Sequence, residues 1–382
     1  MYDFVVVGAG PAGSRFAWRA ATAGRDVLVL ERGAVGRPLA CSGHVSTDLW
    51  EFVPDGAREE LLQNEVSGAR FHAGGPGSDS HLFYSREAIS NVVDRVALDR
   101  TLAAAAREAG AEVREHHRVV GVDEHAGGEG SAGESGSTDG GESPNGHVAV
   151  EARTPEGSGT ETFRARMVAG CDGPVSRVRR ELDLPEPGEL LGGVLAFTEA
   201  EDAGEHVDVH LTVPDFFAWR IPRGAAGVEY GLAAAPGSDA RELFADFTDD
   251  YGVGVETNDV CAGTIPIGPP ERVTGARSFL VGDAAGQTKP FTGGGIVYGM
   301  TAADHAASEI DPRDPRTLAD YERAWRANLA REIRLGRWVR RAYSLPGPIQ
   351  RAGLALLSGE IGVHMDRPTT LFSPAHLRKL LS

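Results

Sequence analysis

The chain has 382 residues, of which 41% are apolar, and its 55 acidic against 38 basic side chains give a formal net charge of −17. This length and apolar content predict two or three domains with a sizeable core, and so negative a chain argues against nucleic acid as a partner. Only two basic residues are lysines, Lys289 and Lys379. The acidic excess with few lysines favours a protein that must stay hydrated in high salt, as in a halophile, although a GC-rich genome would also favour arginine.

The three cysteines, Cys41, Cys171 and Cys261, are far apart in the sequence. Their spacing matches no metal site or disulfide framework, so we expect no metal and a reducing, cytoplasmic location. The chain begins directly with a predicted strand, which predicts no signal peptide. Because no apolar stretch approaches the roughly 20 residues that span a bilayer, any membrane contact is expected to be peripheral, at the inner face of the cell membrane.

The first residues predict a strand, a turn, a helix and a second strand. Phe4–Val7 is a short β-branched run that indicates a buried parallel strand. An alanine-rich helix is expected over residues 12–23 and the second strand over Val27–Leu30. This arrangement is typical of a Rossmann-like dinucleotide-binding unit.

Four residues of this unit indicate where the dinucleotide binds. Gly8 allows the tight turn, Gly10 lets a pyrophosphate approach the backbone, and Gly13 lets the helix pack on the strand. Glu31 ends the second strand, where a carboxylate accepts hydrogen bonds from the ribose hydroxyls of an adenosine. These features predict a dinucleotide site but do not by themselves distinguish FAD from NAD.

Three later segments complete the pattern. Residues 92–122 predict a turn with an arginine, a helix and strands; residues 164–182 predict a strand that ends in Cys171-Asp172-Gly173; and residues 278–295 predict a strand that ends in Gly282-Asp283. In this order, over most of residues 1–310, the chain resembles the FAD-dependent family typified by aromatic hydroxylases.

Within that group the chain looks most like geranylgeranyl reductases, including archaeal enzymes that saturate lipid chains. The closer match is carried by the segments Ala40–Ser46, Val93–Leu102, Phe216–Gly224 and Gly282–Met300. The third segment resembles the family's aromatic-x-Trp-x-x-Pro stretch, in which the first position is usually tyrosine and here is Phe217. That departure puts a role for a phenolic hydroxyl in doubt.

The resemblance implies FAD as the cofactor and implies which residues hold it. Asp283 would accept hydrogen bonds from the ribityl chain, and Gly293–Gly295 would let the backbone lie against the isoalloxazine ring. The helix that starts near Ile296 would point its N-terminus at the pyrimidine side of the flavin. The predicted FAD-binding residues are Gly8, Gly10, Pro11, Ala12, Gly13, Glu31, Arg32, Cys41, Ser42, Gly43, Arg95, Val119, Asp172, Gly173, Gly282, Asp283, Gly293, Gly294, Gly295 and Ile296.

Cys41 is the predicted catalytic residue, because the resemblance places it near the flavin in a loop of small residues. It is equally a candidate for a merely packed side chain, and His44 is a rival proton donor that more often has a structural role. The predicted substrate-contacting residues are Phe217, Trp219, Pro222 and Pro290. Cys171 is expected to be buried packing, and Cys261 is assigned no role.

We expect an α/β fold whose second domain is α+β. The FAD-binding domain would comprise residues 1–65, 86–182 and 262–310, and the substrate-binding sheet domain residues 66–85 and 183–261. Residues 311–382 would form a C-terminal helical region. Residues 125–147 are rich in glycine, serine and glutamate and predict a solvated, flexible loop between two strands.

The predicted function is the FAD-dependent saturation of C=C bonds in geranylgeranyl chains of archaeal membrane lipid or its precursor. Electrons would come from a transiently bound nicotinamide or from a ferredoxin-like donor. A flavin monooxygenase on the same fold, or a flavoprotein that passes electrons to quinone, are the alternatives; scattered cysteines argue against an integral iron–sulfur cluster. The helix carrying Arg331, Arg334, Arg337, Arg340 and Arg341 either meets anionic lipid headgroups or is a solvated face.

Overall fold

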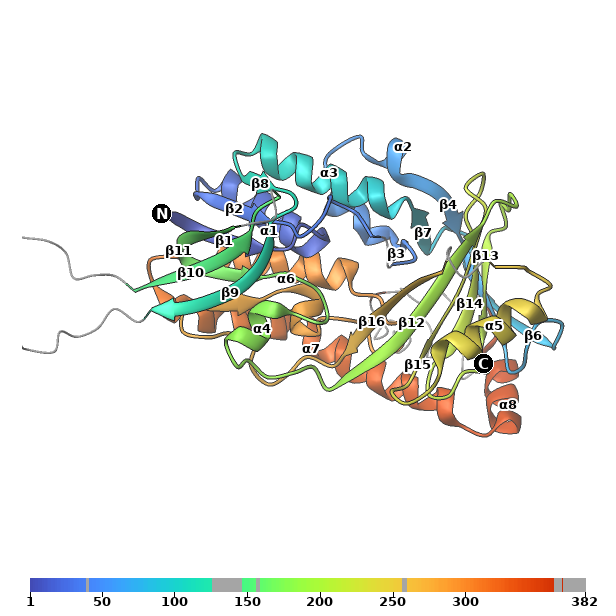
Figure 1. Cartoon of the computed structure of the whole chain (residues 1–382). Coiled ribbons are helices and arrows are strands. Elements are labelled where there is room, and N and C mark those ends of the chain that lie inside the picture. The colour runs from blue at the N-terminus through green and yellow to red at the C-terminus, as the bar shows by residue number, and fades with distance from the viewer. Residues whose placement is uncertain (39–40, 126–145, 156–158, 256–259, 361–365, 367–382) are drawn as a thin grey trace, which may run out of the picture.

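A computed structural model of the chain describes residues 1–38, 41–125, 146–155, 159–255, 260–360 and 366. Two large β-sheets lie at opposite ends of the molecule, and the long helix α7 (Leu318–Arg340) runs along one side from the first sheet to the second (Figure 1). A small third sheet lies between helix α3 (Arg95–Glu108) and the second sheet. The functional site is formed where these parts meet.

The first sheet has the strand order β8-β2-β1-β11-β10-β9. Its parallel part forms because short β-branched runs are buried on both faces. Strand β11 is long enough to pair with β10 through its first half and, in parallel, with β17 through its second half. The strands are β1 (Tyr2–Val7), β2 (Val27–Leu30), β8 (Glu112–Arg114), β9 (Arg118–His125), β10 (His147–Arg153), β11 (Thr160–Gly170) and β17 (Ser278–Leu280).

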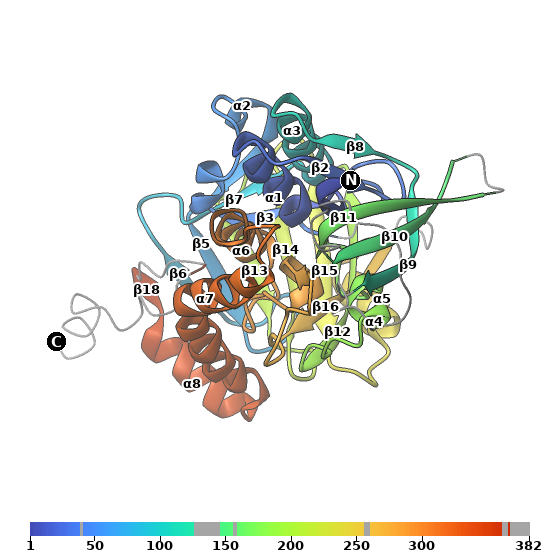
Figure 2. The same ribbon diagram turned by 90° about the vertical axis from the view of Figure 1, so that its left-hand side faces the viewer.

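Helices α1 (Pro11–Thr22), α3 and α6 (Ile296–Glu309) cover one face of the first sheet, and α4 (Arg177–Glu181) lies on the other side (Figure 2). Proline at the first position of α1 suits a helix start, where its missing N–H would have no partner. Asp94 caps α3 by accepting a hydrogen bond from the backbone N–H of Ala97 at 3.0 Å.

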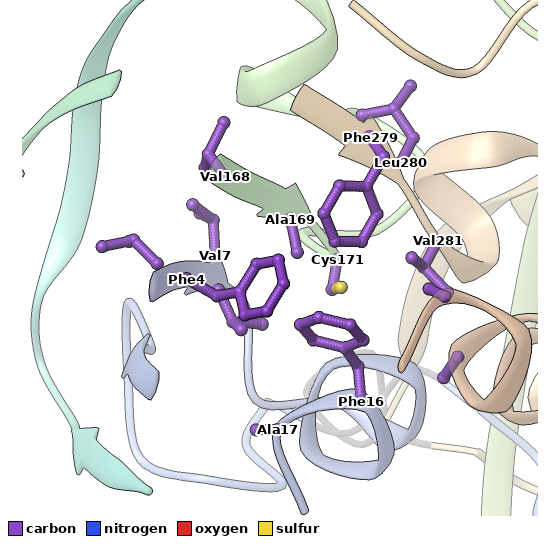
Figure 3. Close-up of a cluster of buried hydrophobic side chains, with 14 of the residues drawn as sticks. Phe4, Val7, Phe16, Ala17, Val168, Ala169, Cys171, Phe279, Leu280 and Val281 are labelled. Atoms are coloured by element: carbon purple, nitrogen blue, oxygen red, sulfur yellow. The ribbon is translucent and has the colours of Figure 1, made fainter. Parts of the chain in front are cut away.

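Aromatic side chains form the centre of the first core. The rings of Phe4 and Phe16 meet edge to face at 5.1 Å, and Phe279 lies 5.2 Å from Phe16 (Figure 3). Helix α7 adds the fully buried Tyr321 and Trp325 to this core. The Tyr321 hydroxyl donates a hydrogen bond to the carbonyl oxygen of Leu280 at 2.8 Å, which ties α7 to the strand that precedes Gly282.

The second sheet has the order β16-β12-β15-β14-β13-β5-β6-β18 and is mainly antiparallel. Helix α5 (Ala240–Asp250) packs Phe244 and Phe247 against one face. The strands are β5 (Gly68–His72), β6 (Ser80–Tyr84), β12 (Glu189–Thr198), β13 (His206–His210), β14 (Phe217–Pro222), β15 (Val228–Ala234), β16 (Cys261–Ile267) and β18 (Gly359–Glu360).

The third sheet, with the order β3-β7-β4, connects the two larger parts. Its strands are β3 (His44–Ser46), β4 (Leu62–Val66) and β7 (Ser90–Val93). The remaining helical elements are η1 (Thr47–Glu51), α2 (Arg58–Leu61), η3 (Gly282–Ala285), η4 (Pro315–Thr317), η5 (Arg341–Ser344) and α8 (Gly347–Leu357).

The α/β class and the first βαβ unit are confirmed, with α1 one residue earlier than predicted and α6 beginning at Ile296. The predicted domain boundary at residue 262 is wrong, because β16 pairs with β12 of the second sheet. The predicted C-terminal region is not purely helical, since β18 pairs with β6. Most of the predicted loop 125–147 lies outside the described residues, but its two ends, His125 and His147, are paired between β9 and β10.

Phe16 offers a test of the first core. Phe16→Ala should lower the free energy of unfolding by about 3–5 kcal/mol, because it removes a fully buried ring and leaves a cavity. Guanidinium unfolding measures the change. Val175→Ala, at a side chain that is 55% exposed, is the control and should change little; equal effects of the two substitutions would contradict this account of the core.

Candidate active site

A largely apolar cavity of about 690 Å³ extends between the first and second sheets. The glycine-rich turn before α1 lines it with Gly10, and the C-terminal helix α8 lines it with Leu354. Asp283 and Cys41 also line it. One continuous space therefore joins the predicted FAD-binding segments to the predicted substrate sheet.

The turn before α1 has the geometry expected for a pyrophosphate site. Gly8 has φ of +101°, and a Cβ there would lie 2.5 Å from the carbonyl oxygen of Cys171, so only glycine fits. The Glu31 carboxylate accepts hydrogen bonds from the backbone N–H groups of Ala9 at 2.8 Å and Gly33 at 3.2 Å. The structure thus places the adenosine-binding carboxylate directly beside the turn.

Asp283 lies at the start of η3, and Gly293–Gly295 line the same cavity. Burial raises the pKa of the Asp283 carboxyl to about 6, and the charge of Arg95 opposes the rise. Among the described residues no side chain or backbone group donates a hydrogen bond to this carboxylate. It is therefore open to hydroxyl donors from a ligand.

The loop that carries Cys41 packs on the start of α3. The Arg95 guanidinium makes a bidentate ion pair with Asp99, at 2.7 and 3.2 Å, and also contacts Cys41. Both charged side chains are buried, yet Arg95 Nε has no hydrogen-bond partner among the described residues. A buried donor without a partner is costly in a finished protein, so Arg95 Nε also indicates a missing polar ligand.

The second sheet supplies an aromatic wall. Phe217 and Trp219 line the cavity, with ring centroids 5.9 Å apart. The ring of Tyr343 meets Phe217 edge to face at 5.6 Å, and its hydroxyl donates to the carbonyl oxygen of Phe291 at 2.8 Å. A phenol from the C-terminal region thus lies next to the phenylalanine that replaces the tyrosine usual in the family.

Comparison with known proteins agrees with this geometry. Residues 1–212 match the FAD binding domain family. A digeranylgeranylglycerophospholipid reductase from Methanopyrus kandleri is 32% identical over 355 residues, which cover 85% of this chain and 82% of the relative. The chain belongs to this family of FAD-dependent reductases.

Solved structures show how widely the fold of this reductase is shared. A geranylgeranyl bacteriochlorophyll reductase-like protein from Thermoplasma acidophilum has a TM-score of 0.79 at 21% identity, with 100% of this chain and 98% of that chain covered. An anhydrotetracycline hydroxylase from Streptomyces rimosus has a TM-score of 0.66 at 22% identity, with 99% and 74% covered. At these identities the likeness concerns the fold alone.

FAD is the cofactor of the reductase family, and the residues present fit it. The free acceptor at Asp283 suits the ribityl hydroxyls, and the unpartnered Arg95 Nε suits another polar atom of the flavin. Beyond an added Cβ at Gly10 there is open space, as close approach of a pyrophosphate needs. The structure therefore brings Glu31, Asp283 and the glycine-rich turn around one cofactor-sized path.

Not all predicted FAD-binding residues of the reductase line the cavity. The Asp172 carboxylate accepts hydrogen bonds from the Ser176 hydroxyl and the Arg177 N–H, both at 2.6 Å, and so holds the start of α4. Val119 is buried in the first core, and Arg32 is exposed. Their contacts with FAD stay predictions, whereas Pro11, Ala12, Ser42, Gly173, Gly282 and Ile296 do line the cavity.

Two predicted substrate residues of the reductase are also outside the described cavity lining. Pro222 ends β14, and its carbonyl oxygen accepts a hydrogen bond from Asn64 at 3.0 Å. Pro290 packs beside Gly336 of α7. Both are buried parts of the scaffold, so a direct contact with substrate stays a prediction.

His44 lines the cavity and shares a 2.7 Å hydrogen bond with the Ser90 hydroxyl. Burial, together with the charges of Lys289 and Arg223, lowers its pKa to about 4. The imidazole is therefore neutral near pH 7, which weakens its case as a proton donor. Cys171 is buried, as predicted.

Sequence reasoning missed several polar residues at the site of the reductase. Lys289 is buried and forms an ion pair with Asp366, whose side chain also contacts the Ser46 hydroxyl. The signal was present, since Lys289 is one of only two lysines and directly precedes the glycine-rich loop. Arg223 and Glu229, described below, were missed because neither belongs to the aromatic motif itself.

Asp283 gives a pH-dependent test of FAD binding. Asp283→Asn should weaken binding roughly 10- to 100-fold near pH 7, because charge-assisted hydrogen bonds contribute about 1.5–3 kcal/mol. Titration of FAD fluorescence measures the affinity. The wild type should lose affinity as the pH falls through about 6, where the carboxylate becomes protonated, and the variant should not.

The same raised pKa has the opposite effect on the FAD-free protein. Its contribution to stability should fall as the pH rises from 3.8 to about 6, because the native state holds the proton more tightly than the unfolded state. Asp320→Asn, at an exposed side chain on α7, is the control for both measurements. Equal changes in both variants would remove Asp283 from the FAD site.

Proposed function

We propose that this protein uses FAD to saturate C=C double bonds of geranylgeranyl chains in an archaeal membrane lipid or its precursor. The observation that carries the proposal is the single apolar cavity, which runs from the flavin-binding residues Asp283 and Gly293 along β14 to α8. A long isoprenoid chain needs such a continuous apolar channel, and the relatives of highest similarity are named for this reaction.

The wall residues suit an apolar chain. Phe217, Trp219 and Ile265 present rings and methyl groups to the cavity, and no ion pair of the described residues is formed by their side chains. An isoprenoid tail would bury its apolar surface here at about 25 cal/mol per Å². The headgroup would stay at the α8 end, where the chain is more exposed.

Two hydrogens must be added to each double bond, one as a hydride and one as a proton. When bound and reduced by a nicotinamide or a ferredoxin-like donor, FAD supplies the hydride. An isolated alkene has no carbonyl group to hold negative charge, so the proton must arrive closely coupled to the hydride. We propose that Cys41 Sγ holds this proton, since Cys41 lines the cavity and contacts Arg95.

The direct test uses FAD-loaded protein reduced with dithionite and mixed, without oxygen, with an unsaturated archaeal-type phospholipid. Mass spectrometry should show a gain of two hydrogens per double bond. An unchanged lipid under several headgroups would overturn the proposal, and substrate-dependent oxygen consumption would favour the monooxygenase alternative. Reduction of quinone without any change in the lipid would favour the electron carrier.

Removal of the thiol tests the proton donor. Cys41→Ser should lower kcat by about 100-fold or more at unchanged FAD content, because general acids contribute that much and a serine hydroxyl is a far weaker acid. Cys261→Ser removes the other half-buried thiol that lines the cavity and should have a much smaller effect. Comparable losses in the two variants would leave Cys41 as packing only.

We further propose that α8 and the end of α7 rest on the membrane surface. Several large apolar side chains are exposed here although they belong to the mouth of the cavity or lie beside it: Trp338, Leu345, Ile349, Leu356 and Leu357. Exposed arginines flank them at Arg334, Arg337, Arg341 and Arg351. Such a surface suits insertion of apolar groups with arginines at anionic headgroups.

One residue of the predicted arginine face has a different role. Arg340 makes a bidentate ion pair with Glu189, at 2.7 and 3.0 Å, and therefore joins α7 to the second sheet. None of the helices in the described ranges has both the length and the apolar composition of a membrane span. Contact of the kind proposed would be peripheral.

Co-sedimentation with anionic vesicles tests the contact. The triple substitution R334Q/R337Q/R341Q should lower the bound fraction, since each basic residue near an anionic surface contributes about 1 kcal/mol. The matched control is R100Q/R118Q/R153Q, which changes three exposed arginines of the first part of the chain. Unchanged binding by the first variant, or equal loss in both, would remove the proposal.

A further inference from the structure

A buried ion pair lies in the second sheet next to the aromatic motif. Arg223, directly after β14, and Glu229, on β15, are 5% and 0% exposed, and Arg223 Nη1 lies 3.0 Å from Glu229 Oε2. Charges so deeply buried persist only with well-placed partners. Neither residue is used in the FAD site or the proposed chemistry.

The Arg223 guanidinium holds more than its ion-pair partner. Nη1 also donates to the carbonyl oxygen of Ser42 at 2.7 Å, and Nη2 donates to Gln63 Oε1. The guanidinium carbon lies 4.8 Å from the centroid of the Phe197 ring. One side chain therefore joins the loop that carries Cys41, the third sheet and the second sheet.

Glu229 holds the tryptophan of the motif. Its second oxygen, Oε1, accepts a hydrogen bond from Trp219 Nε1 at 2.8 Å. The indole lies across Gly231, the register partner of Trp219 on β15, where an added Cβ would collide with the ring. Trp219 thus has its orientation fixed by a hydrogen bond at its edge and by a close backbone approach at its face.

The local backbone explains how Arg223 reaches inward. Its N–H donates to the carbonyl oxygen of Gly227 at 2.9 Å, which closes the turn between β14 and β15. A Cβ at Gly224 would lie 2.6 Å from the carbonyl oxygen of Gln63, so the turn packs directly on β4. The turn is fixed against the third sheet, and the side chain at its first position points to the Cys41 loop.

We propose that Arg223 and Glu229 are positioning residues that fix the Cys41 loop relative to Trp219. The two oxygens of Glu229 and the branched guanidinium of Arg223 form a continuous path of hydrogen bonds from the Trp219 indole to the Ser42 backbone. Ser42 adjoins Cys41, and both line the cavity with Trp219. The proposal rests on the proposed function, in which the substrate double bond lies between these groups.

Loss of Arg223 should leave a folded protein. Burial raises the pKa of Glu229 to about 7, and the Arg223 charge opposes that rise. Without Arg223 the carboxyl would take up a proton instead of remaining as an unpaired buried charge. It would still accept the Trp219 hydrogen bond, so the change is concentrated on the Cys41 loop.

The experiment compares Arg223→Met with the wild type as FAD-loaded proteins. Alkylation of Cys41 by iodoacetamide, followed by peptide mass spectrometry, should become several-fold faster because the loop is no longer tied to the second sheet. In the lipid assay kcat should fall roughly 10- to 100-fold with little change in KM, since small misplacements of reacting groups cost that much. Arg223→Lys keeps the charge but not the branched contacts and should be intermediate.

The matched control is Arg220→Met, which removes an arginine from the same hairpin and breaks its ion pair with Asp202. Neighbouring residues on a strand point to opposite faces, and Arg220 does not line the cavity as described. Equal changes in both variants, or wild-type labelling and kcat in R223M, would overturn the proposal. If R223M yields no folded protein, the labelling and kcat of R223K against R220M decide it.

The two proposals fail in different ways. If the wild-type protein leaves every lipid unchanged, the proposed function fails, whereas the labelling rates of Cys41 still show whether Arg223 holds the loop. If the wild type reduces lipid and R223M does so at the same rate with the same labelling, only the positioning role fails.

Discussion

The close contact between the first turn and the end of β11 is the constraint on which the site depends. Gly8 sits so near the Cys171 carbonyl that no side chain fits, and this contact fixes where α1 begins. The same strand end is followed by β17 at its other side, which delivers Asp283 to the cavity. Segments almost 300 residues apart are thereby joined around one cofactor.

Charge inside an apolar cavity must be balanced locally, and the structure does this with specific pairs. Arg95 is neutralised by Asp99, Arg223 by Glu229, and Lys289 contacts Asp366. Burying an unpaired charge costs several kcal/mol, so each pair allows polar groups to stand beside an isoprenoid channel without opening it to water. The remaining buried donor, Arg95 Nε, is the one left for the cofactor.

The cofactor half of the site was largely predictable from sequence, because its chemistry is carried by short local motifs. Gly10, Glu31, Asp283 and the glycines before α6 each sit at a strand end or a helix start, and those positions follow from local patterns. The substrate half was less predictable. Phe217 and Trp219 were identified through a family motif, but the Tyr343 ring against Phe217 comes from a distant helix end and has no local signal.

The sequence by itself determined the βαβ unit, the FAD-binding turn and the family, since periodicity and glycine spacing are properties of neighbouring residues. Only the tertiary structure decided that β16 belongs to the second sheet, that Asp172 holds α4, and that Arg223 reaches the Cys41 loop. The physical reason is that strand pairing and buried ion pairs join residues far apart in the chain. Their partners are chosen by packing in three dimensions, which a one-dimensional pattern does not encode.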